Sequence, residues 1–433
     1  MTRSRPPLPE GPYLIVGLAR SGRAAASMLA AHGEVIAVDS GQPDVGGLDV
    51  GVHLGSDGVE LLGRVRTVVK SPGVPRAAPV VAQALQRGIE VTGELELAWR
   101  LLANAFVAVT GTNGKTTTVE LLGAIWRAAG RPVAVAGNVG TPLGSLVGAI
   151  DPAATVICEC SSFQLEDTAA FRPECAVLLN VEPDHLDRHG DLDAYTLAKL
   201  AIFANQQPGD TAVIARDFDA LAPGSGHRVR LGDDEAGDGA LRLSGAAIAI
   251  DQIRLRGAHN LENIAAAALA AEAMAIPRAA IFEALKTFAG VPHRLEEVAT
   301  VGGVLYVNDS KATNVASAIR GIEAFDGGVH AILGGSLKGG GFAGLRAAVG
   351  SPATACYLIG TAADELARDL DGAAQLHRCA TLERAVELAA TAARPGEVVL
   401  LSPACASFDG FRDYEHRGDR FRELVAAIGP AGE

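Results

Sequence analysis

The stretch Val107–Thr118, VAVTGTNGKTTT, contains the pattern that most constrains the fold. A short apolar, β-branched run leads into Gly111 and Gly114, and Lys115 and Thr116 follow directly. This order predicts a strand, a glycine-rich turn and a helix start, whose backbone N–H groups and helix dipole bind phosphate. A lysine at this place can reach the β- and γ-phosphates of ATP, and the threonine hydroxyl can bind Mg²⁺. The stretch therefore predicts an ATP-binding domain of the phosphate-loop type.

The match to the general phosphate-loop pattern, G-x-x-x-x-G-K-[ST], covers only its second half. Val109 stands where the first glycine of that pattern would fall. A tight strand-to-helix turn with a surface lysine is therefore an alternative interpretation of this segment alone. The rest of the chain has to decide between the two, because glycine serves both kinds of turn.

The composition favours several α/β domains. The chain has 433 residues, of which 48% are hydrophobic and 20% charged, so two or three domains can each bury a core. The formal net charge is −13 and no lysine- or arginine-rich run occurs, which argues against nucleic acid as a partner. Small anionic ligands need only a local pocket and are compatible with this charge.

Targeting patterns and cysteine spacing bear on location. Met1–Gly11 is polar and proline-rich, and the apolar run Tyr13–Ala19 is too short for a signal peptide. No segment reaches the roughly 18–20 apolar residues of a membrane span. The six cysteines include no pair of C-x-x-C motifs. We therefore expect a cytoplasmic protein with free thiols and no membrane insertion.

A second nucleotide-binding pattern opens the chain. Tyr13–Gly22, YLIVGLARSG, predicts a strand, a glycine turn and a helix, and Glu34–Asp39 predicts a second strand with an acidic end. The glycine pattern, G-x-A-x-x-G, is degenerate and does not by itself imply NAD. Lys70–Pro75, KSPGVP, follows another short strand, and its glycine lets a ligand approach closely. These segments predict a Rossmann-like N-terminal domain over residues 1–98.

The alternation of strands and helices continues through two further domains. A helix leads into the second, predicted from the apolar spacing of Leu95, Ala98, Trp99 and Leu102. This central ATP-binding domain is expected over residues 99–290, with loops or a peripheral β element at 221–245. The strand–helix texture then restarts and predicts a Rossmann-like C-terminal domain over residues 291–433. The expected fold is thus α/β with three domains.

Motifs in all three predicted domains resemble, in order, those of the Mur ligases. They are TGTNGKTT, GNVG (137–140), ECSSFQLE (159–166), NVEPDHLDRHG (180–190), GAHNLEN (257–263), GVPHRLE (290–296), NDSKATN (308–314), LGGSLKGG (333–340) and SPACASFDGF (402–411). Any one motif is modest support, but their order across nearly the whole chain is specific. The opening GLARSG and the late SPACASFDGF are most similar to the branch of the family that adds D-glutamate.

The resemblance implies an ATP-dependent ligase that adds D-glutamate to UDP-N-acetylmuramoyl-L-alanine in cytoplasmic peptidoglycan precursor synthesis. A carboxylate is a poor electrophile, so ATP converts it to an acyl phosphate, which the amine then attacks. The implied cofactors are ATP and Mg²⁺ in two sites, and we expect a monomer. The alternatives are another Mur ligase, a folylpolyglutamate synthase, a nicotinamide dehydrogenase, or a nucleotide-regulated binding module without turnover.

The resemblance also assigns the ATP-side residues. The phosphate loop supplies Gly111, Thr112, Asn113, Gly114, Lys115, Thr116 and Thr117. Asn263 is assigned to adenine, Arg294 and Lys311 to phosphate, and Asp309 to ribose. A helix cap formed by Asp309 or Ser310 is an alternative role for NDSKATN.

The implied metal ligands and catalytic residues lie in the central domain. Thr116 and Glu159 resemble the ligands of one Mg²⁺, and His185 and a carbamylated Lys199 those of a second. Lys115, Asn138, His185 and Lys199 form the implied catalytic set, with Asn138 near the reacting centre. Positive charge beside Lys199 would favour its neutral amine, which reacts with CO₂ to give an anionic oxygen ligand.

The substrate residues implied by the resemblance lie in the outer domains. The UDP part is assigned to Arg20, Ser21, Asp39, Ser40, Ser71, Pro72 and Gly73. D-Glutamate is assigned to Thr313, Lys338, Ser407, Phe408 and Tyr414. The chain departs from some relatives at three places near these residues, Gly41, Ser336 and Gly341. The departures bear on substrate contacts and leave the ligase chemistry intact.

Overall fold

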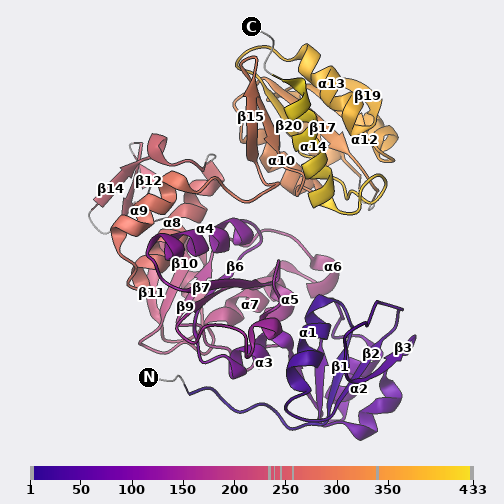
Figure 1. The fold of residues 1–433 in the computed structure, drawn as a ribbon, viewed down its shortest axis with the longest axis vertical. Coiled ribbons are helices and arrows are strands. Elements are labelled where there is room, and N and C mark those ends of the chain that lie inside the picture. The colour runs from indigo at the N-terminus through magenta and orange to yellow at the C-terminus, as the bar shows by residue number, and fades with distance from the viewer. Residues whose placement is uncertain are drawn as a thin grey trace. The chain divides into compact units, whose positions relative to one another are not determined.

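The computed structural model describes residues 4–232, 236–237, 239–243, 246–255, 258–337 and 341–429. The chain divides into two units, one formed by residues 1–254 and 259–288 and the other by residues 255–258 and 289–433. Figure 1 labels the helices and strands of each unit. Parallel sheets covered by helices form the framework of both, so the predicted α/β fold is confirmed.

A five-stranded parallel sheet forms the N-terminal part of the first unit, in the order β3-β2-β1-β4-β5. Its strands are β1 (Tyr13–Val16), β2 (Val35–Asp39), β3 (Gly51–Leu54), β4 (Thr67–Lys70) and β5 (Glu90–Gly93). Its helices are α1 (Arg20–Leu29) and α2 (Pro79–Gln86), with a 3-10 turn at Val59–Arg64. Because the strands are parallel, the loops after β1, β2 and β4 meet at one edge, where nucleotides bind in such sheets.

A six-stranded parallel sheet forms the central part of the first unit, in the order β11-β10-β9-β6-β8-β7. Its strands are β6 (Ala105–Thr110), β7 (Val133–Gly137), β8 (Thr155–Glu159), β9 (Cys175–Leu178), β10 (Thr211–Ala215) and β11 (His227–Leu231). Its helices are α3 (Glu94–Leu101), α4 (Lys115–Ala128), α5 (Ser162–Leu165), α6 (Leu186–His189), α7 (Leu192–Leu200), α8 (Ala258–Ala273) and α9 (Arg278–Thr287).

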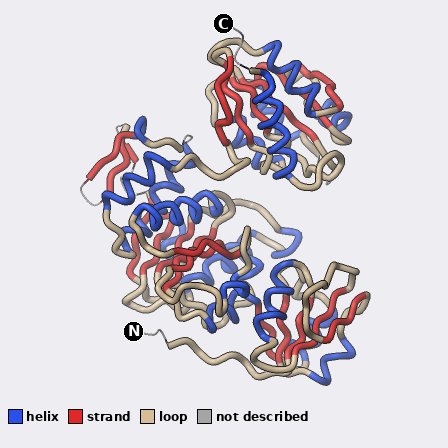
Figure 2. Tube along the Cα trace, viewed as in Figure 1, coloured by secondary structure: helices blue, strands red, loops and turns tan. Residues whose placement is uncertain are grey.

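The expected peripheral β element of the central region is present as a small antiparallel sheet. Its strands, in the order β12-β13-β14, are Ala236–Gly237, Ala240–Leu243 and Ala246–Ala249. Figure 2 distinguishes these short strands from the loops around them.

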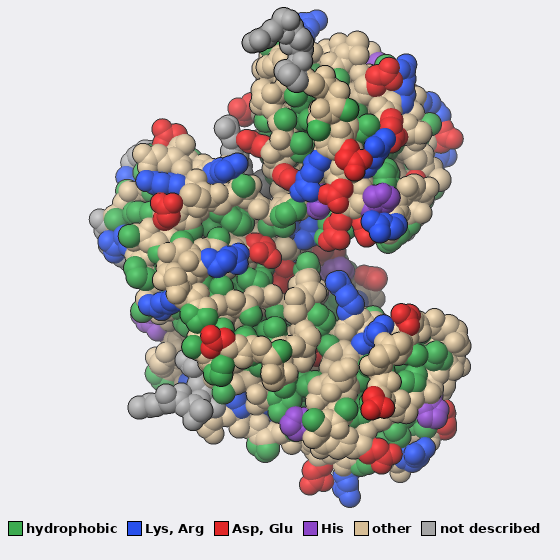
Figure 3. Space-filling model, viewed as in Figure 1, with side chains coloured by type: hydrophobic (Ala, Val, Ile, Leu, Met, Phe, Trp, Pro, Cys, Tyr) green, Lys and Arg blue, Asp and Glu red, His purple; other side chains and the backbone are tan. Residues whose placement is uncertain are grey.

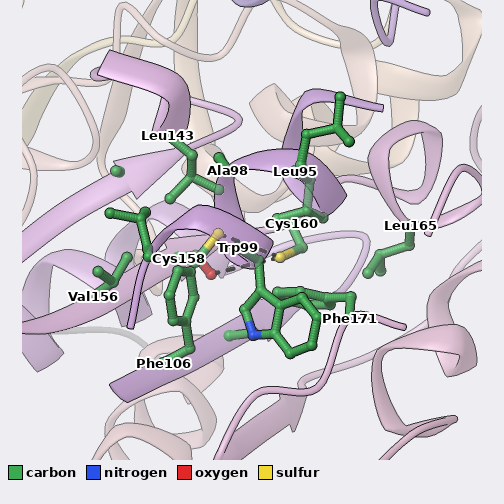
Figure 4. Packing of buried hydrophobic residues seen from close by; sticks show 14 of the residues in the cluster. Leu95, Ala98, Trp99, Phe106, Leu143, Val156, Cys158, Cys160, Leu165 and Phe171 are labelled. Atoms are coloured by element: carbon green, nitrogen blue, oxygen red, sulfur yellow. Dashed lines mark hydrogen bonds between the residues drawn. The ribbon is translucent and has the colours of Figure 1, made fainter. Parts of the chain in front are cut away.

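One hydrophobic core joins the two large sheets of the first unit. Trp99 on α3 packs edge-on against Phe171 at 5.8 Å between ring centroids, and Phe171 packs edge-on against Phe106 of β6 at 6.2 Å (Figure 4). The same cluster of buried side chains includes Tyr13 and Ile15 of β1. The predicted apolar face of α3 is confirmed, because Leu95, Ala98, Trp99 and Leu102 are all buried. Shared burial of this kind explains why both sheets belong to one unit.

The second unit contains a six-stranded sheet in the order β15-β16-β20-β17-β18-β19. Its strands are β15 (Glu296–Val301), β16 (Val304–Asn308), β17 (Val329–Gly334), β18 (Ala353–Ile359), β19 (Gln375–Ala380) and β20 (Val398–Leu401). Its helices are α10 (Val315–Glu323), α11 (Arg346–Gly350), α12 (Ala363–Asp369), α13 (Leu382–Ala392) and α14 (Tyr414–Ile428). Strand β15 is antiparallel to β16 and the other pairings are parallel. Separate hydrophobic cores lie against the sheet.

Surface charge, helix composition and the cysteines give three further observations. On the face shown in Figure 3, Lys and Arg side chains are interspersed with Asp and Glu. Among the helices of the described residues, none is long and apolar enough to cross a membrane. All six cysteines are buried and free.

Candidate active site

The glycine-rich loop between β6 and α4 has the backbone that a phosphate loop requires. Gly114 has a φ of 81°, and a Cβ added there would lie 2.0 Å from Oδ1 of Asn263. Only glycine therefore fits between the start of α4 and this asparagine. Lys115 folds over the loop, with Nζ donating hydrogen bonds to the carbonyl oxygens of Gly111 at 2.7 Å and Thr112 at 2.9 Å. The predicted strand, turn and helix are thus present, with the lysine at the loop.

Hydrogen bonds from the end of β9 fix the shape of this loop. The N–H of Thr112 donates to the carbonyl of Asn180 at 3.0 Å, and the N–H of Asn113 donates to the Asn180 side chain at 2.9 Å. The Thr112 hydroxyl accepts from the N–H of Glu182 at 3.0 Å and lies 3.2 Å from the hydroxyl of Tyr195. Asn180 and Tyr195 were not among the site residues predicted from the sequence. The only signal for them was their position beside candidate residues, in the NVEPDHLD motif and one helical turn before Lys199.

Glu159 lies at the carboxyl end of β8, directly beside β6. Strand register pairs it with Val109, so its side chain and the phosphate loop emerge at the same edge of the sheet. Its Oε1 accepts a hydrogen bond from Nδ2 of Asn138 at 3.0 Å. Its Oε2 is buried and has no hydrogen-bond partner within the described part of the chain. A buried carboxylate oxygen without a partner is unfavourable, so this atom suits a cation that arrives with the substrate.

The chemistry of this donor set fits Mg²⁺ supplied with ATP. In the described residues no group of three or more His, Cys, Asp and Glu side chains is placed to hold a metal ion. Mg²⁺ commonly binds through only one or two carboxylates and completes its coordination with phosphate oxygens and water. Glu159, at 2% exposure, and the buried Thr116 would be such protein ligands.

Lys199 is buried at 1% exposure on α7, and its ammonium group faces another cation. Its Nζ donates to the carbonyl oxygen of Gly111 at 2.7 Å, the same oxygen that accepts from Lys115. The Nζ also lies 4.4 Å from the centroid of the Tyr195 ring. Burial, followed by the charge of Lys115, lowers the pKa of Lys199 to about 6. At neutral pH this side chain is therefore largely an uncharged amine.

His185 begins α6 in an unusual backbone conformation. Its φ is 52°, in the left-handed region, and its side chain is 48% exposed. Its ring centroid lies 4.9 Å from that of Phe163 and 6.3 Å from that of Tyr195. The exposed imidazole is thus held by aromatic contacts on the side of the sheet where the phosphate loop lies.

The predicted UDP residues gather around the loop after β1, and several have partners within the chain. Both Asp39 oxygens accept backbone N–H groups, from Leu18 at 2.7 Å and Gly41 at 2.8 Å. The Ser71 hydroxyl donates to the carbonyl of Gly17 at 2.7 Å, and the Ser21 hydroxyl donates to Glu94 at 2.7 Å. The exposed members of the predicted set are Arg20, Ser40 and Gly73. Hydrogen bonds within the chain therefore fix the loop after β1. The exposed predicted residues at this edge remain accessible to a ligand.

In the second unit, Asp309 points into the protein. It accepts from the Ser402 hydroxyl at 2.6 Å and from the N–H of Leu295 at 3.3 Å, and burial raises its pKa to about 7. The charge of Arg294 opposes that rise. The alternative role for NDSKATN is wrong in detail, because the N-cap of α10 is Asn314, whose side chain accepts from the N–H of Ser317 at 2.8 Å. Asn314 directly precedes the first helical residue, and asparagine is among the preferred N-cap residues, whereas Asp309 and Ser310 lie too far from the helix start to cap it.

The other predicted residues that the structure describes in the second unit follow β16, follow β20 or begin α14. The Nζ of Lys311 lies 5.9 Å from the centroid of the Tyr414 ring. Ser407 is buried, whereas Phe408 is 74% exposed. Thr313 is partly buried, and Lys338 lies outside the described residues. Of the departures from relatives, Ser336 donates from its hydroxyl to Asp409 at 3.3 Å.

Comparisons with known proteins agree along the whole chain. Three family models match in order: the Mur ligase MurD-like N-terminal domain over residues 12–93, the Mur ligase middle domain over 109–271, and the Mur ligase glutamate ligase domain over 293–405. The UDP-N-acetylmuramoylalanine–D-glutamate ligase of Acidobacterium capsulatum is 42% identical, with 96% of both chains covered. The same-named protein of Salinibacter ruber is 43% identical over 96% of this chain and 97% of its own.

Solved structures share the fold at lower identity. The UDP-N-acetylmuramate-alanine ligase MurC of Thermotoga maritima superposes with a TM-score of 0.59 at 17% identity, covering 97% of this chain and 100% of that one. The MurF ligase of the same organism gives 0.57 at 19% identity, covering 97% and 96%. At these identities the structures support the fold alone.

Proposed function

Because this chain belongs to the Mur ligase family, we propose that it joins D-glutamate to UDP-N-acetylmuramoyl-L-alanine with hydrolysis of ATP, in peptidoglycan precursor synthesis. The observation that carries the proposal is identity of about 42% over 96% of the chain to relatives with this named activity. A bifunctional folylpolyglutamate synthase/dihydrofolate synthase of Yersinia pestis has a similar fold, with a TM-score of 0.55, but only 18% identity. The solved MurC and MurF structures are 17% and 19% identical to this chain, so the relatives named for D-glutamate addition carry the proposal.

The reaction has two bond-forming steps. A carboxylate oxygen of the donor attacks the γ-phosphorus of ATP, the bond to the β-phosphate oxygen breaks, and ADP leaves. The amine nitrogen of D-glutamate then attacks the carbonyl carbon, loses a proton, and phosphate leaves as the amide forms. The first step brings two anions together, so positive charge at the phosphates lowers its barrier.

Lys115 and the phosphate loop are proposed to hold ATP. The ammonium of Lys115 lies at the loop carbonyls and is positioned to move onto the β- and γ-phosphates when they enter. The proposed phosphate and nucleotide contacts come from Gly111, Thr112, Asn113, Gly114, Thr116, Thr117, Asn263, Arg294, Asp309 and Lys311. Mg²⁺ held by Thr116 and Glu159 would neutralise phosphate charge, and the unpartnered Glu159 oxygen supports this assignment. Asn138 fixes the other Glu159 oxygen and is proposed to contact the donor near its reacting carboxylate.

Lys199 is proposed to carry a carbamate beside His185, where it would bind a second Mg²⁺. Its neutral amine supports this, because an uncharged nitrogen can attack the carbon of CO₂ and release a proton to solvent. The carbamate product carries a negative charge. It would therefore attract the Lys115 ammonium, which the buried amine faces. The added negative charge would stabilise the loop that Lys115 and Lys199 share.

The outer regions are proposed to hold the two substrates. The loop after β1 and the exposed residues Arg20, Ser40 and Gly73 are proposed for the UDP part, together with Ser21, Asp39, Ser71 and Pro72. D-Glutamate is proposed to contact Thr313, Lys338, Ser407, Phe408 and Tyr414. We also propose a monomeric, cytoplasmic enzyme.

Phosphate release tests the proposed function. The protein is incubated with ATP, Mg²⁺ and UDP-N-acetylmuramoyl-L-alanine, and D-glutamate, L-glutamate or L-lysine is added in separate reactions. We expect release that requires both the nucleotide sugar and D-glutamate. Release with L-lysine only, or with no acceptor at all, would contradict the assignment. The variant Lys115→Met serves as the inactive control, because it removes the phosphate-loop cation and keeps a side chain of similar length.

A further inference from the structure

We propose that Arg188 is a positioning residue that ties the candidate donor-binding loop, residues 71–75, to the helix that begins at His185. The proposal rests on the proposed function and adds to it a residue that couples donor binding to nucleotide binding. Arg188 lies on α6, three residues after His185, and its side chain is 13% exposed. It belongs to the central sheet region, but its hydrogen bonds reach the N-terminal sheet region.

The guanidinium of Arg188 bridges the two regions directly. Its Nη2 donates to the carbonyl oxygen of Val74 at 3.0 Å and to Oε1 of Glu166 at 2.8 Å, and its Nη1 donates to the carbonyl of Gly73 at 3.5 Å. Gly73 and Val74 belong to the donor-binding loop, and Glu166 ends α5. One planar group therefore holds the loop against the central region from two sides, which a guanidinium fork can do and a single ammonium cannot.

Buried charges complete this junction. Lys70, at the end of β4, donates to the same Val74 carbonyl at 3.0 Å, and it pairs with Asp167 at 2.6 Å and Glu166 at 3.4 Å. Lys70 and Arg188 thus face two carboxylates, and the more exposed Arg76, which donates to the Glu166 carbonyl at 3.3 Å, adds positive charge near Asp167. If the Arg188 guanidinium is removed, Glu166 loses its 2.8 Å partner and the contact to Gly73 is lost.

Phe163 carries the effect from Arg188 to His185. The guanidinium carbon lies 4.4 Å from the centroid of the Phe163 ring, and the same ring contacts His185 at 4.9 Å and stacks on His189 at 5.4 Å between centroids. Helix α6 has only four residues, too few to be stable by itself, so its orientation depends on contacts such as these. Arg188 and Phe163 together therefore set where the His185 imidazole lies relative to the donor-binding loop.

The expected consequence is an energetic coupling between two ligands. The donor binds at the loop that Arg188 grips, and its carboxylate has to reach the phosphates beside His185. A rigid junction lets binding of the Mg²⁺–nucleotide pre-order the donor-binding loop, and the reverse must hold by linkage. Breaking the junction should leave each ligand able to bind but remove much of the mutual enhancement.

Calorimetry on the full-length protein tests this coupling. The affinity for UDP-N-acetylmuramoyl-L-alanine is measured with and without Mg²⁺ and a non-hydrolysable ATP analogue, in the wild type and in Arg188→Lys. In the wild type we expect Mg²⁺ and the ATP analogue to raise the affinity for the nucleotide sugar at least about fivefold. In Arg188→Lys we expect them to raise it less than about twofold. In turnover, the variant should show a raised KM for the nucleotide sugar and a KM for ATP within about twofold of the wild type.

Two further variants keep the test decisive. Arg172→Lys is the matched control, because Arg172 makes a bidentate pair with Asp210 at 2.6 and 3.2 Å elsewhere in the central region and should retain the coupling. Phe163→Leu removes the ring but no charge, should reduce the coupling in the same direction, and decides the question if Arg188→Lys does not fold.

The outcomes separate this inference from the proposed function. A wild type that turns over but shows no coupling, or an Arg188→Lys that keeps it, overturns the role of Arg188 alone. A wild type that binds the ATP analogue but does not release phosphate with D-glutamate overturns the proposed function instead.

Discussion

Two buried lysines of the first unit, Lys70 and Lys199, have almost the same exposure and opposite surroundings. Lys70 is 0% exposed and lies 2.6 Å from Asp167 and 3.4 Å from Glu166. Lys199 is 1% exposed, and its contacts are a carbonyl oxygen and an aromatic face; the charge of Lys115 acts on it more strongly than the opposing charge of Asp184. The comparison teaches that burial alone does not decide what a lysine does. Lys70 pairs with carboxylates inside the protein, whereas Lys199, with its lowered pKa, is the lysine proposed to react with CO₂.

The difference has a direct electrostatic cause. A buried ammonium is stable where carboxylates repay its lost hydration, and two carboxylates surround Lys70. At Lys199 burial and the Lys115 charge both disfavour the ammonium, which lowers its pKa to about 6. Each of the predictions below changes one side of this comparison.

The largest effect is expected from Lys199→Ala. We expect kcat to fall on the order of 10²–10³-fold, as when one group that stabilises charge in the transition state is removed. Binding of an ATP analogue should change little, because Lys115 and the loop glycines remain. Added formate or acetate should restore part of the rate by supplying the missing carboxylate. Full activity without any added acid would show that the Lys199 side chain plays no part.

Lys70→Met should mainly affect stability. Removing one partner of a buried ion pair leaves Asp167 uncompensated, which costs about 3–5 kcal/mol. Urea denaturation monitored by tryptophan fluorescence measures the change, since Trp99 and Trp126 both lie in the first unit. The double variant Lys70→Met/Asp167→Asn should recover part of the loss. If the single variant unfolds at the wild-type urea concentration, the structural role of Lys70 is wrong.

The pH dependence of stability should distinguish Lys199 from a charged lysine. Its pKa is about 6 in the folded chain and returns to its usual, higher value on unfolding, so the unfolded chain binds more protons between these values. Lys199 should therefore contribute a part of the free energy of unfolding that rises with pH, by up to about 1.4 kcal/mol per pH unit from about pH 6 to about pH 10. In CO₂-free buffer, Lys199→Met should lack this contribution, so the difference between the two proteins should grow with pH. Parallel curves for the two proteins would contradict a lowered pKa.

The smallest effect is expected from Tyr195→Phe. The substitution removes the contact between the Tyr195 hydroxyl and Thr112 at 3.2 Å but keeps the ring beside Lys199. We expect a stability loss of about 0.5–1.5 kcal/mol and a change in kcat within about threefold. Tyr195→Leu also removes the ring, so it should raise the KM for ATP more than Tyr195→Phe does. A loss of activity in Tyr195→Phe as large as in Lys199→Ala would mean that the hydroxyl takes part in catalysis.

Local patterns were enough to predict much of the fold. The phosphate loop, the apolar face of α3 and the strand–turn–helix at the start of the chain each depend on residues close in sequence. The order of the motifs then identified the family. The exact bounds of the three predicted domains, and the ligand contacts assigned to individual residues, stay predictions.

Long-range packing explains what the sequence could not show. The hydrogen bond from Lys199 to Gly111 joins residues 88 positions apart. The surroundings that lower the pKa of Lys199 are therefore not visible in the sequence around either residue. The inward direction of Asp309 depends on Ser402, 93 positions away. Arg188 looked like an ordinary charged residue within its motif, because its carbonyl acceptors lie 114 and 115 positions earlier.

The measurement that tests the central claim most directly is ¹³C NMR of the protein equilibrated with ¹³C-labelled bicarbonate, with and without Mg²⁺. If Lys199 is a reactive neutral amine, the wild type and Lys70→Met should both show a carbamate resonance that is absent from Lys199→Ala. No carbamate resonance in the wild type at saturating bicarbonate, or one that persists in Lys199→Ala, would contradict the account of the two lysines.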